Sequence, residues 1–195
     1  SLENLPRLKT LVAHHRAIDA ADLTLVTLAG DFVAPSVLSS LDSGQGMVDC
    51  LNQIGVTHLI LGNHEDDIAT EDLHSRIAEA NGRILGTNLP SFDAKMHRSD
   101  IVEVQQAGGR RVRVGLVGIV MTDRSIYRRD PFGGAEMESP NESALGEAAR
   151  LMREDGCAVV VPMTHQTIEE DRALALLQRQ PPFPVIVGGH EHQVT

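Results

Sequence analysis

The sequence predicts an α/β domain, because short aliphatic runs alternate along it with segments of helical periodicity. Each run is as long as a short buried strand and leads to polar residues. The chain has 195 residues, 42% of them hydrophobic, which is enough to bury one substantial core. We therefore expect one domain over residues 1–195. The aliphatic runs lie at residues 23–28, 59–61, 158–161 and 184–187.

Helical periodicity predicts several helices between these runs. The first precedes residue 23, and its apolar face would consist of Leu5, Leu8, Leu11, Val12 and Ile18. A second helix is expected at residues 46–54, where Gly55 supplies the usual helix-ending residue. Further helices are expected at residues 71–80, 142–154 and 168–178.

Three other segments complete the predicted elements. The apolar runs 101–104 and 112–120 flank Ala107-Gly108-Gly109, which predicts an antiparallel hairpin with a short turn, and residues 84–85 are expected to begin a further strand. Residues 123–139 are rich in Arg, Asp, Gly and Pro, so we expect an exposed loop near the site. Its basic residues are either solvated side chains, which general frequencies favour, or groups that steer a phosphate. They are Arg124, Arg128 and Arg129.

Three polar clusters directly follow aliphatic runs, and the run at residues 158–161 leads to a fourth. Since the ends of neighbouring strands meet at one edge of a sheet, we expect these side chains to converge. Carboxylate, carboxamide and imidazole groups together suit Mn, Fe, Zn or Co better than Ca or Mg. The pattern therefore predicts a metal-dependent hydrolase. The clusters are Gly30-Asp31, Gly62-Asn63-His64-Glu65, Thr164-His165 and Gly189-His190-Glu191-His192.

The charge balance limits the partners of the protein. There are 17 basic and 27 acidic residues, and the net charge of −10 argues against a general nucleic-acid or anionic-membrane surface. A phosphate-bearing substrate would then depend on bound cations, whose charge the sequence does not count. No apolar run is long enough to cross a bilayer. Cys50 and Cys157 form neither a disulfide framework nor a zinc-finger spacing.

In order and spacing, the four clusters resemble the motifs of the calcineurin-like metallophosphoesterases. Within that superfamily they are most similar to the branch of 5'-nucleotidases and 2',3'-cyclic-nucleotide phosphodiesterases. The resemblance implies a four-layer α/β/β/α sandwich with two mixed sheets. It also implies hydrolysis of small phosphate esters, with nucleotides as the favoured substrates.

By this resemblance, five residues would act as metal ligands. Asp31 would bridge two metals, because a bridging carboxylate can hold two cations that clamp a phosphoryl group from both sides. Asn63, His165 and His190 would complete the shell of the second metal, and His192 would bind the first. His190 and His192 are two positions apart, which suits an extended segment with both side chains on one side.

The resemblance also implies how a proton is transferred. His64 would protonate the departing alkoxide as the general acid, a contribution of roughly 10² to 10⁴ in rate. Asp67 would accept the other ring proton and orient the imidazole. Asp66 is the alternative for that second role. The other histidines of the chain are expected to have no role in the site.

One family feature is absent. The family opens with a strand that carries an Asp-x-His motif, and no such motif precedes Asp31. We therefore expect a domain truncated at its N-terminus, without its first strand and with one competent metal site instead of two. Neighbouring strands would have unpaired backbone groups, so another segment or a second copy of the chain would cover them. We expect no C-terminal nucleotidase domain in this chain.

Two alternatives to a nucleotide phosphoesterase remain open. A chain that binds one metal or phosphate without turnover is supported by the absent Asp-x-His motif. A dinucleotide-binding module is supported only by Gly44-x-Gly46, and no Gly-x-Gly-x-x-Gly directly follows a strand. Gly44 and Gly46 are expected to begin a helix instead.

Overall fold

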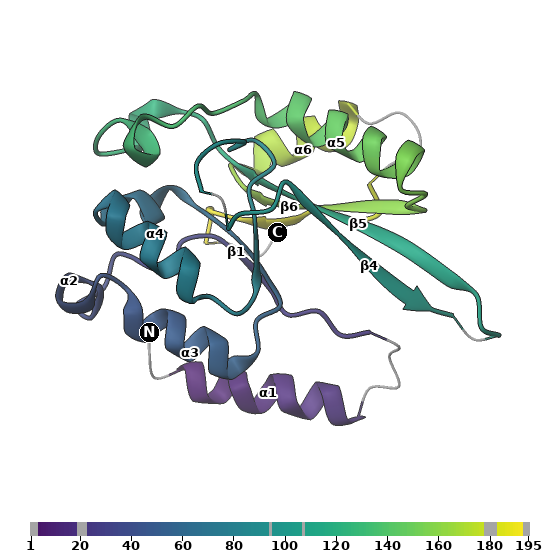
Figure 1. Cartoon of the computed structure of the whole chain (residues 1–195), viewed down its shortest axis with the longest axis horizontal. Coiled ribbons are helices and arrows are strands. Elements are labelled where there is room, and N and C mark those ends of the chain that lie inside the picture. Colours follow the sequence, from purple (N-terminus) through teal and green to yellow (C-terminus); the bar gives the residue numbers. More distant parts are fainter. Residues whose placement is uncertain (1–3, 19–22, 94, 107, 178–182, 193–195) are drawn as a thin grey trace.

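The computed structural model describes residues 4–18, 23–93, 95–106, 108–177 and 183–192. Two β-sheets face each other, and helices cover both outer surfaces (Figure 1). The order of the layers is therefore helices, sheet, sheet, helices. This arrangement confirms the predicted α/β class and its four layers.

The first sheet contains β1 (Thr27–Ala29), β2 (His58–Ile60) and β3 (Arg83–Leu85) in that order. Both of its strand pairs are parallel, so the carboxyl ends of all three strands meet at one edge. The predicted strand at residues 23–28 is shorter in the structure and begins later. It pairs with β2 over Thr27–Ala29.

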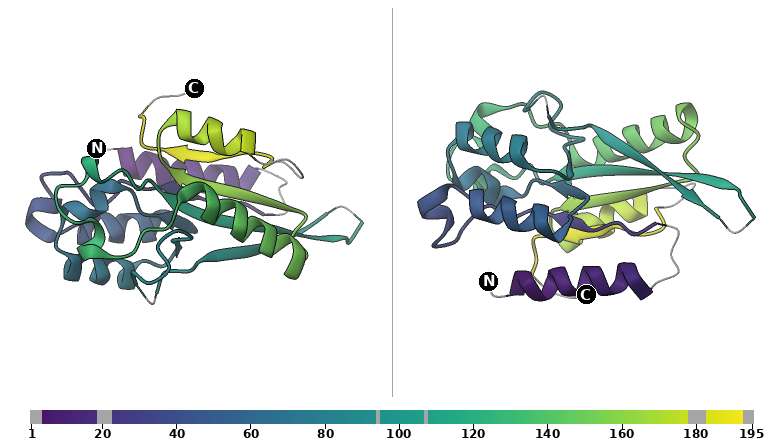
Figure 2. Two further views of the ribbon diagram at one scale, coloured as in Figure 1. Left: turned by 90° about the horizontal axis from the view of Figure 1, so that it is seen from above. Right: turned by 60° about the horizontal axis from the view of Figure 1, so that its bottom comes forward.

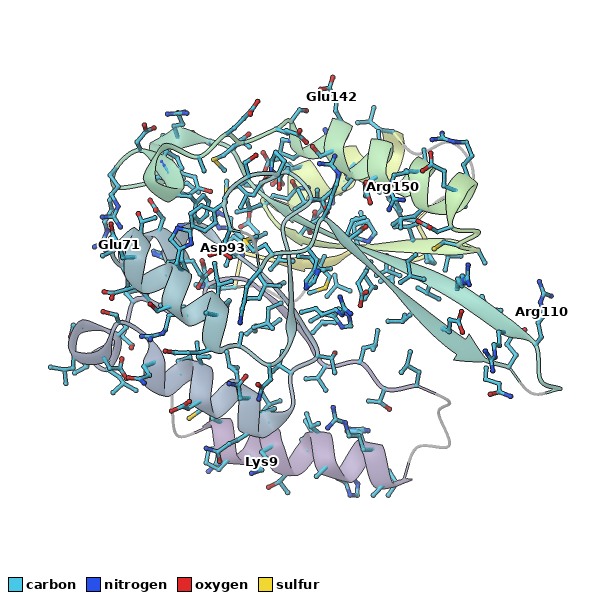
Figure 3. The ribbon with its side chains drawn as sticks, viewed as in Figure 1. Lys9, Glu71, Asp93, Arg110, Glu142 and Arg150 are labelled. Atoms are coloured by element: carbon cyan, nitrogen blue, oxygen red, sulfur yellow. The ribbon has the colours of Figure 1, made fainter. Side chains whose placement is uncertain are left out.

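The second sheet has the order β4 (Ser99–Gln105), β5 (Arg111–Val120), β6 (Val159–His165) and β7 (Val187–Gly189). It is mixed, because β4 and β5 form the predicted antiparallel hairpin while β5, β6 and β7 run parallel. The end of this hairpin projects beyond the body of the molecule (Figure 2). Arg110 lies at its tip and points away from the sheets (Figure 3).

The helices agree with the predicted segments. Gly55 adopts the left-handed conformation (φ +83°) and ends α3, where its N–H donates to the carbonyls of Leu51 and Asn52. No helix in the described part of the chain is both long and apolar enough to span a bilayer. The helices are α1 (Leu5–Ile18), α2 (Ser39–Asp42), α3 (Gln45–Ile54), α4 (Thr70–Glu79), α5 (Pro140–Glu154) and α6 (Ile168–Leu177), with short 3-10 turns η2 (Asn63–Asp67), η3 (Arg124–Ile126) and η4 (Pro131–Gly134).

Close packing between the sheets brings the strand ends together. A side-chain cluster fills this space and contains Ile60, Leu85, Leu116 and Met163. Gly118 of β5 lies at the contact, because an added Cβ would be 2.6 Å from Leu85 Cβ and 2.7 Å from Ile60 Cγ2. Only glycine therefore fits at this position without moving the first sheet.

Helix α1 differs from its prediction. It forms where expected, but none of its residues is buried, and Leu11 and Ile18 are 52% and 60% exposed. The helix lies outside α3, at the edge of the molecule (Figure 2). Leu5 and Val12 pack against the core from there. The predicted apolar face is therefore only partly covered.

The segment at residues 123–139 is mostly exposed, as expected, but it has buried anchor residues. Tyr127 and Phe132 are buried, and Phe132 is only 2% exposed. Its ring lies 5.2 Å from that of Phe92 and 5.7 Å from that of Tyr127, centroid to centroid. The loop is thus attached to the core by aromatic packing.

Candidate metal and phosphoester site

Four of the predicted ligands meet around one ring nitrogen. His165 ends β6, and its Nε2 lies 3.2 Å from Asp31 Oδ2, 3.2 Å from Asn63 Oδ1 and 3.3 Å from His190 Nδ1. These residues follow β1, β2 and β7. The convergence predicted from the strand ends is therefore present in the structure.

The donor set fits a divalent cation. One ligand atom each from Asp31, His165 and His190 lies within 4.8 Å of the others. His165 Nδ1 is 2.7 Å from the carbonyl oxygen of Ala29, which can only accept, so Nδ1 carries the proton. In the neutral ring the lone pair of Nε2 then faces the acceptor oxygens of Asp31 and Asn63. A cation satisfies such a set of facing lone pairs.

The pKa shifts of the three residues follow from burial and from their contacts with one another. Burial raises the pKa of Asp31, but the contact with His165 and the backbone N–H of His64 outweigh it, and the net pKa is lowered. For His165, burial lowers the pKa, and the contacts with Asp31 and the Ala29 carbonyl outweigh it, so the net pKa is raised. Burial and then the charge of His165 lower the pKa of His190. Asp31 is thus anionic and His190 is neutral at pH 7.

His190 and His192 do not form the extended segment that their spacing suggested. Strand β7 ends at Gly189, and both histidines have positive φ angles, 84° and 52°. The turn directs His190 toward His165. His192 is exposed and lies outside the group of Asp31, His165 and His190. The prediction of an extended segment here is therefore wrong, although both residues line the same cavity.

A cavity of about 490 Å³ opens beside this group. Its walls come from β1, the start of α6 and the segment after β7, and they include His192 and the buried carboxylate of Asp171. A volume of this size is typical of pockets for small ligands. The cavity contacts the group directly, since Asp31, His165 and His190 also line it.

His64 lies next to the same group and has a carboxylate partner. Its backbone N–H donates to Asp31 Oδ1 at 3.0 Å. Its ring Nδ1 donates to Asp67 Oδ2 at 2.7 Å. Asp66, the alternative partner, accepts the N–H of Phe132 at 2.9 Å instead. The carboxylate that contacts the His64 ring is therefore that of Asp67, not that of Asp66.

Glu65 belongs to the site architecture, although no role for it was predicted from the sequence. Its fully buried carboxylate accepts the N–H groups of Asp31 and Gly62 on one oxygen and those of Phe32 and Val33 on the other, at 2.6–2.9 Å. Burial and the charge of Asp31 raise the net pKa of Glu65, while the N–H groups of Val33, Gly62 and Asp31 oppose that rise. The residue joins the turns after β1 and β2. The position of Glu65 in the same motif as Asn63 is the sequence feature that could have indicated this role.

Other histidines lie outside the site. His58 pairs with Asp100 at 3.0 Å, between the two sheets, and His74 on α4 pairs with Asp93. Both have partners that account for their positions. This agrees with the expectation that they take no part in the site.

The family model described as calcineurin-like phosphoesterase matches residues 2–194. A probable 5'-nucleotidase of Treponema pallidum (strain Nichols) is 27% identical over 174 residues, which is 86% of this chain and 28% of that protein. An apyrase of Aedes aegypti is 26% identical over 169 residues, which is 84% of this chain and 29% of that protein. The chain therefore spans less than a third of the length of these relatives.

Solved structures have the same fold. A 5'-nucleotidase precursor from Thermus thermophilus matches with a TM-score of 0.80 and 25% identity, over 95% of this chain and 36% of that one. The NAD nucleotidase of Haemophilus influenzae matches with a TM-score of 0.80 and 20% identity, over 95% of this chain and 32% of that one, which shows the fold alone. Motifs, layers and the nearly full-length family match agree, and the chain belongs to the calcineurin-like phosphoesterase family.

Proposed function

We propose that this chain is a phosphoesterase domain of the 5'-nucleotidase type that hydrolyses small phosphate esters. The observation that carries the proposal is the group of Asp31, His165 and His190 within 4.8 Å, with His64 beside it. The names of the relatives, a probable 5'-nucleotidase and an apyrase, favour nucleotides as substrates.

Calcineurin-like phosphoesterases depend on metal ions, and the donor set fits that requirement. In our proposal Asp31, Asn63, His165 and His190 hold one divalent ion, which is Mn, Zn, Fe or Co. When bound, the ion supplies positive charge to the phosphoryl oxygens and activates the attacking water. Asp31 and His192, which line the same cavity, are the proposed ligands of a second ion.

His64 is the proposed general acid. Asp67 accepts a hydrogen bond from Nδ1–H of the His64 ring, which holds the imidazole in one orientation. The opposite ring nitrogen is then available to protonate the oxygen of the leaving group. Proton transfer matters most when that oxygen belongs to an alcohol, as in a nucleoside 5'-phosphate.

The edge of β1 is the proposed place of an additional strand. In the described residues β1 pairs with β2 on one side, and the cavity lies against its Leu28 and Ala29. Unpaired backbone groups at such an edge favour another strand. We propose that another segment or a second copy of the chain covers it. Light scattering tests the second-copy version, since a strictly monomeric chain with intact sheets would contradict it.

The test of the proposed function combines metal content with hydrolysis. The protein is incubated with Mn²⁺ or Zn²⁺, freed of excess metal and assayed by elemental analysis. Adenosine 5'-monophosphate, 4-nitrophenyl phosphate and bis(4-nitrophenyl) phosphate are then offered as substrates. Bound metal with turnover supports the proposal. Bound metal without turnover on any of the three would instead favour a binding domain, the alternative raised by the absent Asp-x-His motif.

A further inference from the structure

We propose that Arg128 is a positioning residue for proton donation by His64, a role that rests on the proposed phosphoesterase function. Arg128 Nε lies 2.9 Å from Asp67 Oδ1. The other oxygen of that carboxylate, Oδ2, is the one 2.7 Å from His64 Nδ1. Arg128, Asp67 and His64 thus form one continuous series of charge-assisted contacts.

The carboxylate of Asp67 needs such a partner to be held in one orientation. Rotation about the bond between Cβ and the carboxyl carbon is only weakly restricted, so a carboxylate bonded on one side can turn. In the structure its side chain is 10% exposed, and each oxygen has a partner from a different part of the chain. Arg128 therefore fixes the plane of the acceptor and, through it, the ring of His64.

The fold determines where Arg128 lies, because the residues on both sides of it are anchored. Before it, the Tyr127 hydroxyl donates to the carbonyl of Met121 at 2.7 Å. After it, Arg129 Nη2 donates to the carbonyls of Asp66, at 2.9 Å, and Ile68. Arg128 is therefore not a free surface side chain that contacts Asp67 by chance.

The two adjacent aspartates have separate tasks. Asp66 Oδ1 accepts the N–H of Phe132, the buried aromatic residue that attaches the loop to the core. Asp67 contacts His64 and Arg128. The loop is thus fastened through one aspartate while it orients the other. This arrangement explains why two acidic residues, Asp66 and Asp67, stand next to each other: one anchors the loop and the other contacts His64 and Arg128.

Stability alone does not account for the contact. The Arg128 side chain is 70% exposed, and exposed ion pairs add little to the free energy of folding. We therefore expect Arg128→Ala to change the melting temperature by less than about 2 °C. A lysine has no planar fork to fix the carboxylate, so Arg128→Lys should restore only part of the function.

Kinetics with two leaving groups test the role. The alkoxide leaving group of adenosine 5'-monophosphate needs a proton, whereas 4-nitrophenolate hardly does. Arg128→Ala should lower kcat about tenfold for the nucleotide and less than about twofold for 4-nitrophenyl phosphate, with KM unchanged. Arg124→Ala is the matched control, because Arg124 is in the same loop and pairs with the exposed Asp130. Equal losses of kcat on both substrates would overturn the proposal.

A double variant separates positioning of His64 from other effects. In a His64→Gln background, Arg128→Ala should produce no further loss on the nucleotide, because the group that Arg128 positions is gone. A further loss of about tenfold would mean that Arg128 acts independently of His64, which would also overturn the proposal.

A spectroscopic measurement keeps the proposal testable if the chain proves inactive. The Nδ1 proton of His64 should give a downfield NMR signal, assigned by its loss in His64→Gln. The signal should persist in Arg124→Ala and broaden or vanish in Arg128→Ala at the same pH. That result without any hydrolysis would contradict the phosphoesterase function and support the positioning role. An unchanged signal in Arg128→Ala would overturn the role whether or not the enzyme is active.

Discussion

The carboxylate of Glu65 accepts the backbone N–H of Asp31 at 2.7 Å, so the turn after β2 fixes the residue that follows β1. Asp31 adopts a positive φ of 56°, which few residues other than glycine tolerate without support. Glu65 also accepts the N–H groups of the two residues after Asp31. One buried carboxylate thus holds the proposed metal ligand in its unusual backbone conformation.

Glu65→Gln should therefore destabilise the fold. The amide nitrogen would face backbone donors, and two N–H groups would lose their acceptor. Each buried unsatisfied donor costs roughly 1–3 kcal/mol, so we expect a loss of about 3 kcal/mol. Thermal unfolding should show a melting temperature lower by about 10 °C. Glu136→Gln, at an exposed position, is the control and should change little. Equal melting temperatures for the two variants would contradict this role of Glu65.

Gly62→Ala should damage the metal group without unfolding the protein. Gly62 has an ordinary φ of −109°, so alanine is not strained there. Its Cβ would, however, lie 2.3 Å from Asp31 Oδ1 and 2.7 Å from His165 Cε1. We expect the affinity for Mn²⁺ to fall at least about tenfold, with circular dichroism unchanged.

The control for that variant is Gly146→Ala in α5, where an added Cβ meets nothing within 4 Å. Alanine favours a helix interior, so this variant should gain about 0.5–1 kcal/mol of stability and bind Mn²⁺ as the parent does. If Gly62→Ala also bound Mn²⁺ normally, the metal group would not be where the structure indicates.

Glu147 gives a prediction for acid pH. This buried carboxylate contacts Arg150, Ser99 and Arg98 at 2.6–3.1 Å, and Arg150 lies on the face of α5 toward the second sheet (Figure 3). Burial raises the pKa of Glu147, but the bonds from Arg150, Ser99 and Arg98 outweigh it and lower the net pKa below 4.5. Its contribution to stability is therefore complete above pH 4.5 and is lost as the pH falls through the lowered pKa.

Glu147→Gln tests whether the pKa of Glu147 is lowered in the folded state. At pH 7 the variant should be less stable by about 1–3 kcal/mol in urea unfolding. The difference from the parent should shrink as the pH is lowered below about 4.5, because the parent then also has a neutral side chain. A difference that grows toward acid pH would mean that the pKa of Glu147 is raised in the folded state.

Much of the fold could be predicted because the chain marks its strand ends and helix ends locally. The hairpin of β4 and β5 follows from two apolar runs around Gly108 and Gly109, which both have positive φ. Gly55 ends α3 as its sequence position indicated. The convergence of Asp31, Asn63, His165 and His190 followed from their places after strands.

The errors arise where distant parts of the chain decide the local structure. The orientation of His190 depends on a turn after β7, not on strand spacing. Arg128 and Arg129 bind Asp67 and Asp66, which lie about 60 positions earlier and could not be paired from sequence. Aromatic packing of Phe132 attaches the loop to the core, although most of its residues are exposed. The exposure of α1 reflects its position outside α3, which it contacts with one face.

Calorimetric titration with Mn²⁺ tests the central claim most directly, using the parent chain, Asp31→Asn and Asp49→Asn. Asparagine tolerates the positive φ of Asp31, so the first variant removes a charged ligand without changing the backbone. Asp49 is an exposed residue of α3 and serves as the control. We predict about one Mn²⁺ per chain for the parent and for Asp49→Asn, and an affinity at least about 100-fold weaker for Asp31→Asn. Equal affinity in all three proteins, or no binding by the parent, would contradict the assignment of this group as a metal site.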